Sequence, residues 1–96
     1  MGTRNKFRLQ FSSEVYPPQE DTWFLTEVLK EFFNKKTDLS SKIINVCEIG
    51  IGSGYISTTL GRLFPNINLI GIDIFLQAVK LSYENMKTKI PFNRFS

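Results

Sequence analysis

The residues best suited to chemistry are three alternating glycines, Gly50, Gly52 and Gly54, which stand between two acids, Glu48 and Asp73. Glycines at this spacing remove every second side chain. The backbone can then turn tightly, and a ligand can lie against main-chain N–H groups at the start of a helix. An acid that ends the next strand is typical of a carboxylate that binds a ribose. The pattern therefore predicts a turn that holds a ligand carrying a ribose.

A strand–turn–helix–strand unit must position these residues. Residues 43–49 form an apolar run, which is typical of a strand covered on both faces and favours a parallel sheet. Residues 56–64 place apolar side chains on one face of a helix, which Pro65 ends. A second apolar strand, residues 67–72, leads to Asp73. The βαβ unit thus has roughly the ~30 residues of a nucleotide-binding unit.

The segments before this unit suggest an arm and then a domain. Residues 1–12 are expected to form an N-terminal arm or edge strand, because apolar and polar side chains alternate over residues 6–11. Residues 13–96 are expected to form one partial domain. Near its start, Pro17 and Pro18 exclude a helix interior and require an extended segment.

Two further helices are expected to cover the sheet. The first begins with the acids Glu20 and Asp21, whose charge favours the N-terminal end of a helix dipole. Its expected core residues are Trp23, Phe24, Leu25, Val28, Leu29, Phe32 and Phe33. The second spans residues 75–87, with an apolar stripe made of Leu76, Val79, Tyr83 and Met86. Residues 87–96 are expected to contain no strand, and Pro91 argues against a continuation of the helix.

Composition excludes several classes of function. The 96 residues carry a net charge of +3 with the basic residues spread out, which indicates ordinary solvation and not a nucleic-acid surface. Without histidine there is no imidazole catalysis and no histidine metal site. Cys47, the one cysteine, is expected to be a small buried residue. No apolar run approaches a membrane span and no signal peptide is evident, so we expect no membrane partner and a cytoplasmic or nuclear location.

Two segments carry a resemblance to a known family. Residues 48–54, EIGIGSG, resemble the first motif of the S-adenosylmethionine-dependent methyltransferases with a Rossmann-like fold, and Asp73 resembles their second-strand acid. Residues 15–25, VYPPQEDTWFL, are similar to the V-Y-x-P-x-E-D-T-x-x-L segment of the eukaryotic HemK-like methyltransferases, which methylate a glutamine of the translation release factor. The implied fold class is α/β, a Rossmann-like class I methyltransferase fold truncated to a β-α-β-α core with an N-terminal strand and helix.

The resemblance implies S-adenosyl-L-methionine as the cofactor. The residues that it assigns to cofactor binding are Tyr16, Thr22, Glu48, Gly50, Gly52, Gly54 and Asp73. Glu48 would help to hold the amino-acid portion of the donor, the glycines would let the backbone approach it, and Asp73 would accept both ribose hydroxyls. Tyr16 and Thr22 stand in the segment that lies over the methyl donor in the family.

The catalytic motif of the family, N-P-P-[YF], has no counterpart, because residues 91–93 do not match it. No catalytic residue is therefore assigned, and the chain is expected to be a truncated gene product or a cofactor-binding remnant of a HemK-like methyltransferase. The implied partners are the release factor as substrate, a small zinc-binding activator protein, and a second copy of the chain, because both edges of the short sheet would be bare.

Four alternatives are considered at this point. The acceptor could be an adenine amine, as in N6-adenine methyltransferases of the same family. The chain could be a non-catalytic module that binds the donor or a partner protein. A dinucleotide-binding domain is disfavoured, because Tyr55 or Ser57 stands where the third glycine of its fingerprint belongs, and a purely structural turn is the remaining alternative.

Overall fold

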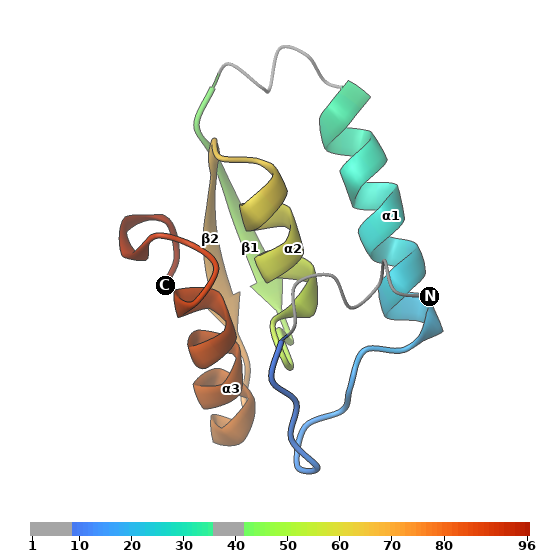
Figure 1. Ribbon diagram of the computed structural model, residues 1–96, viewed down its shortest axis with the longest axis vertical. Helices are drawn as coiled ribbons and strands as arrows, with labels where there is room; N and C mark the ends of the chain where they lie inside the picture. The colour runs from blue at the N-terminus through green and yellow to red at the C-terminus, as the bar shows by residue number, and fades with distance from the viewer. Residues whose placement is uncertain (1–8, 36–41) are drawn as a thin grey trace.

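Two parallel strands lie at the centre of the computed structural model, which describes residues 9–35 and 42–96 (Figure 1). The elements in chain order are α1 (Glu20–Lys35), β1 (Ile44–Ile49), α2 (Tyr55–Leu63), β2 (Ile67–Ile72), α3 (Leu76–Lys87) and a short 3-10 helix, η3 (Phe92–Arg94). The strands pair in register, from Ile44 opposite Ile67 to Ile49 opposite Ile72. The chain is therefore an α/β protein, as expected. None of the helices in the described part of the chain is long and apolar enough to cross a membrane.

The βαβ unit begins and ends at the residues that local sequence signals predict. Gly54 has a left-handed backbone conformation and stands at the N-terminal cap of α2. At the other end the N–H of Phe64 donates to the carbonyl of Leu60 before Pro65 stops the helix. A tight connection follows, in which the N–H of Ile67 donates to the carbonyl of Phe64. This short connection aligns β2 beside β1.

The sheet is covered on one face only, which corrects the expectation of a strand buried on both faces. Ile67 and Leu69 are buried under α2 and α3. The alternate side chains point the other way: Ile49 is 81% exposed, and Cys47 is exposed as well, although we expected it to be buried. Both crossover helices lie on the same side, so nothing in the described residues covers the opposite face. We call that surface the open face.

The helices also bury different residues from those that periodicity predicts. On α1, Phe24 is 72% exposed, and Thr26 is the buried side chain. On α3, Met86 alone of the predicted apolar stripe is buried, and the other buried side chains are those of Ala78, Ser82 and Asn85. The reason is that α3 packs against the glycine turn, where close approach requires small or polar side chains.

The C-terminal residues pair with β2, which corrects the expectation that residues 87–96 contain no strand pairing. Phe95 forms a parallel bridge with Leu69. The N–H of Ser96 donates to the carbonyl of Leu69 and the N–H of Gly71 donates to the carbonyl of Ser96, each at 2.9 Å. One edge of the sheet is therefore partly covered.

The predicted N-terminal edge strand does not occur where the structure can test it. Residues 9–11 adopt no strand, and residues 6–8 lie outside the described residues. Within residues 9–35 and 42–96, no strand pairs with the outer edge of β1.

Arg94 joins the C-terminal segment to the end of α2. Its guanidinium donates to the carbonyls of Gly61 and Phe64, each at 2.8 Å, and to the carbonyl of Ile67 at 2.9 and 3.1 Å. The carbonyls of Gly61 and Phe64 lie at the C-terminal end of α2, where the helix dipole favours a cation, and the carbonyl of Ile67 lies at the start of β2. Arg94 thus holds the C-terminal segment against α2 and β2. The hydrophobic core consists of Ile51, Ile67, Leu69, Met86, Ile90 and Phe95.

Self-association stays a prediction, now confined to the outer edge of β1. The N–H groups of Ile44 and Gly50 donate toward β2, so the N–H of Cys47 points away from β2. We expect a dimer in sedimentation at micromolar concentration, and Cys47→Pro should abolish it, because proline removes an edge donor. Cys47→Ala should leave the dimer intact. A monomeric parental chain with a cooperative melt would contradict the prediction.

Candidate functional site

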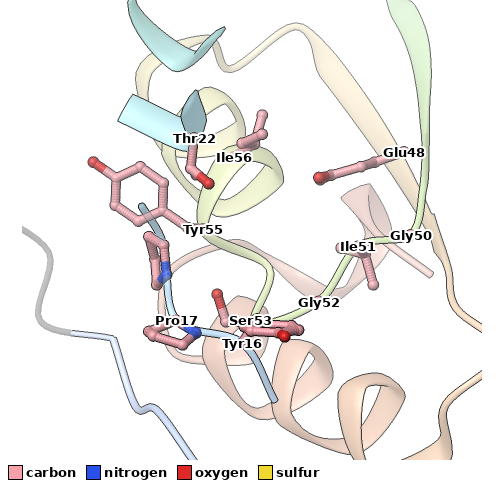
Figure 2. Close-up of a pocket in the computed structure, with 11 residues that line it drawn as sticks. Tyr16, Pro17, Thr22, Glu48, Gly50, Ile51, Gly52, Ser53, Tyr55 and Ile56 are labelled. Carbon is pink, nitrogen blue, oxygen red and sulfur yellow. The ribbon is translucent and has the colours of Figure 1, made fainter. Parts of the chain in front are cut away.

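A cavity of about 200 Å³ opens at the C-terminal end of β1 (Figure 2). Its lining residues are Tyr16, Pro17, Pro18, Thr22, Glu48, Gly50, Ile51, Gly52, Ser53, Tyr55 and Ile56. They come from the extended segment before α1, the start of α1, the end of β1, the glycine turn and the start of α2. Ligands of open α/β sheets bind at the carboxyl ends of parallel strands, so the position of the cavity suits a binding site.

The three glycines of the turn serve two different purposes. All have left-handed backbone conformations, with φ of 73° at Gly50, 57° at Gly52 and 86° at Gly54. A Cβ on Gly50 or Gly52 would meet nothing within 4 Å, and both residues line the cavity. A Cβ on Gly54 would lie 3.0 Å from the Cβ of Ser82 on α3. Gly54 therefore packs the turn against α3 and does not line the cavity.

Glu48 brings a carboxylate into the cavity. Figure 2 shows its side chain pointing from β1 toward the start of α2, where the hydroxyl of Ser57 donates to Glu48 Oε1 at 2.5 Å. Burial raises the pKa of the Glu48 carboxyl, and hydrogen bonds from the hydroxyl and backbone N–H of Ser57 oppose this effect. A partly desolvated carboxylate of this kind would gain from the arrival of a cation.

Asp73 lies outside the cavity lining but is bonded to the turn. Its Oδ2 accepts a hydrogen bond from the N–H of Gly52 at 3.0 Å, and its Oδ1 accepts one from the N–H of Phe75 at 2.9 Å. The bonds from Phe75 and Gly52 hold the pKa of the Asp73 carboxyl below its ordinary value. Asp73 therefore fixes the turn to the end of β2, a role that its sequence position did not reveal. Its contact with a ribose stays a prediction.

The extended segment before α1 forms another part of the cavity lining (Figure 2). Tyr16 is 87% exposed and stands at the rim, and Thr22 lines the cavity from α1. The ring of Trp23 meets that of Tyr55 edge to face, with centroids 4.8 Å apart, which fixes α1 near the turn.

Sequence reasoning missed part of the lining. The residues not assigned in advance are Pro17, Pro18, Ile51, Ser53, Tyr55 and Ile56. Each stands within two positions of an assigned residue, so the motifs themselves were the available signal.

The raised pKa of Glu48 leads to a pH-dependent prediction. Because its pKa is higher in the folded chain than in the unfolded chain, folding is favoured below the ordinary glutamate range and loses stability as pH rises through the raised value. Glu48→Gln should therefore increase the free energy of unfolding at pH 7, and the gain should vanish in acid. Urea unfolding across this pH range measures it. Glu14→Gln, at an exposed site, is the matched control, and an equal gain there would contradict the assignment.

Comparison with known proteins agrees with the site. Over 73 residues the chain is 37% identical to the release factor glutamine methyltransferase of Dictyoglomus turgidum, covering 76% of this chain and 24% of that protein. Over 83 residues it is 30% identical to the methionine S-methyltransferase of Wollastonia biflora, covering 86% of this chain and 7% of that protein. No protein-family model and no solved structure matches.

Both relatives are methyltransferases, so the resemblance found in the sequence is confirmed. The chain spans about a quarter of the length of the first relative and less of the second.

Proposed function

We propose that this chain is the donor-binding part of an S-adenosylmethionine-dependent methyltransferase of the HemK-like family, with a Rossmann-like fold. The observation that carries the proposal is the cavity at the end of β1, in which Gly50 and Gly52 leave open space beside the carboxylate of Glu48. The similarity to two methyltransferases supports it.

The residues that line the cavity fit the chemistry of the donor. S-adenosylmethionine supplies a methyl group on a sulfonium, ready for transfer to a nucleophile. Glu48 offers a negative charge to the ammonium group of its amino-acid portion. Gly50 and Gly52 let that portion lie against the backbone, because neither position carries a side chain into the open space.

Asp73 is able to accept ribose hydroxyls while it holds the turn. Its two oxygens accept backbone hydrogen bonds from Gly52, Phe75 and Ile74, and a carboxylate has about four lone-pair sites, so acceptor capacity remains for a ligand. The lowered pKa keeps this carboxylate ionised, and hydrogen bonds to an ionised acceptor are the stronger kind.

Binding by residues 1–96 should be weak, and methyl transfer should not occur. The cavity of about 200 Å³ is below the ~300–1,000 Å³ typical of small-molecule sites, so it encloses only part of the donor. No N-P-P-[YF] motif is present to hold an acceptor. The acceptor that we propose is a glutamine of a translation release factor, with a small zinc-binding activator as a further partner. The similarity to a release factor glutamine methyltransferase supports this over an adenine acceptor.

Calorimetric titration with S-adenosylmethionine and S-adenosylhomocysteine tests the proposal. The parental chain should bind both, and Asp73→Ala should weaken binding roughly 10- to 150-fold, because charge-assisted hydrogen bonds are lost. Glu84→Ala, which removes a carboxylate on the outer side of α3, should bind like the parent. Unchanged affinity in Asp73→Ala would refute the role of that residue.

Two controls decide the class of function. Binding of a dinucleotide in place of S-adenosylmethionine and S-adenosylhomocysteine would overturn the proposal. A radiolabel assay with purified release factor should show no transfer by this chain, and turnover would refute the expected inactivity.

A further inference from the structure

A buried amide, Asn85 on α3, joins two segments that are distant in sequence. Its side chain is 2% exposed. Its Oδ1 accepts a hydrogen bond from the N–H of Gln10 at 2.7 Å, and its Nδ2 donates to the carbonyl of Gln10 at 2.9 Å. The same Nδ2 donates to the carbonyl of Ser53 at 2.8 Å. One side chain thus binds both the N-terminal segment and the glycine turn.

The two partners of Asn85 belong to two different segments that line the cavity. Ser53 belongs to the turn and itself lines the cavity. Gln10 belongs to the segment of residues 10–18, which turns at residues 12–15, where the N–H of Val15 donates to the carbonyl of Ser12 at 3.2 Å. The side chain of Val15 is buried, and the segment ends at Pro17 and Pro18, which also line the cavity. We call residues 10–18 the strap.

The side-chain amide of Asn85 pairs with the backbone of Gln10 as a neighbouring strand would. The amide satisfies both the N–H and the carbonyl of Gln10, which would otherwise have no partner from a neighbouring strand. The close packing of Gly54 on Ser82, one helical turn before Asn85, sets the height of the turn above α3. Asn85 therefore fixes both the strap and the glycine turn to α3.

We propose that Asn85 is a positioning residue for donor binding, which couples docking of the strap to occupation of the cavity. This inference rests on the proposed function. A ligand that contacts both the strap and the glycine turn binds better when the strap is docked. By linkage, the bound ligand stabilises the docked strap by the same free energy. The backbone of Gln10 is attached through two hydrogen bonds, so the strap can open locally without unfolding the sheet.

Three variants separate this role from a general effect on folding. Asn85→Asp keeps the acceptor for the N–H of Gln10 and removes the donor to Gln10 and Ser53. Gln10→Pro removes the N–H of Gln10 and leaves α3 unchanged. Asn68→Asp is the matched control, because Asn68 makes one exposed hydrogen bond to Asn45, at the end of the sheet opposite the turn.

Binding of S-adenosylhomocysteine is measured well below the melting temperature of each variant. We expect the dissociation constant to rise about tenfold or more in Asn85→Asp and in Gln10→Pro, and to stay within twofold in Asn68→Asp. The two changes remove different hydrogen bonds of Asn85, but each should release the strap by itself, so the double variant should be little worse than either single one. Parental affinity in either strap variant, or full additivity in the double variant, would overturn the inference.

Cleavage at Glu14 by a glutamate-specific protease reports strap docking without any ligand. Cleavage should be faster in Asn85→Asp than in the parent, and S-adenosylhomocysteine should slow it in the parent and much less in the variant. Equal rates of cleavage in the ligand-free parent and Asn85→Asp would refute strap docking by Asn85. A parental chain that fails to bind S-adenosylhomocysteine would refute the proposed function and the coupling, whereas the ligand-free rates would still decide the docking.

Discussion

Gly52→Val is expected to abolish donor binding while the chain still folds. Gly52 has a φ of 57°, a conformation that a β-branched residue adopts only with strain, which costs about 1 to 3 kcal/mol. The larger effect is on the ligand, because the new side chain would enter the open space of a cavity of only about 200 Å³. Calorimetry with S-adenosylhomocysteine should show no binding, and circular dichroism should show retained helices.

Gly54→Ala provides the contrast for this experiment. Its Cβ would lie 3.0 Å from the Cβ of Ser82, so the substitution strains the packing of the turn on α3 and adds nothing to the cavity. We expect it to lower stability and to reduce binding only through the displaced turn. Parental affinity in Gly52→Val would show that its glycine serves the fold alone and not the ligand.

Arg94→Leu is expected to destabilise the fold by about 3 kcal/mol. The substitution removes the guanidinium from three carbonyls at the end of α2 and the start of β2, and hydrogen bonds to charged groups contribute roughly 1.5 to 3 kcal/mol each, with incomplete additivity. The melting temperature should fall by about 12 to 24 °C in a domain of this size.

Two further variants, Arg94→Lys and Lys87→Ala, serve as controls for the effect of Arg94→Leu on stability. Arg94→Lys should recover only part of the loss, because the lysine side chain is one bond shorter than the path to Nη2, the atom that contacts all three carbonyls, and it has no counterpart of the Nε donor. Lys87→Ala removes a surface ion pair with Glu84, with a Nζ to Oε1 distance of 3.2 Å, and should cost less than about 1 kcal/mol. A melting temperature for Arg94→Leu close to that of Lys87→Ala would show that the Arg94 contacts contribute little.

The order and limits of the central elements followed from local sequence. Helix α2 was predicted over residues 56–64 and spans Tyr55–Leu63, and β2 was predicted and found over residues 67–72. Glycine, proline and apolar periodicity influence the backbone over only a few neighbouring residues. These signals can therefore be interpreted without knowledge of the fold. The cavity lining near the glycine turn could also be predicted, because the residues that form it are neighbours in the sequence.

The sequence did not reveal which side chains would be buried. An apolar stripe on α1 or α3 looks like core in isolation, yet Phe24 and Leu76 are exposed and Ser82 and Asn85 are buried. Burial depends on which face of a helix meets another element. Here α3 packs against the glycine turn through the face that carries Ser82 and Asn85. Among the described residues, the sheet is covered by helices on one face only.

The βαβ unit, the glycine turn and the residue types that would line a donor site can be predicted from the amino-acid sequence. Three sets of contacts depend instead on how the elements pack: Asp73 accepts a hydrogen bond from the N–H of Gly52, Arg94 donates to a carbonyl at the end of α2, and Asn85 joins Gln10 to Ser53. These bonds connect residues separated by 21 to 75 positions. No local pattern encodes such pairs, because their partners become neighbours only after the strands and helices have packed.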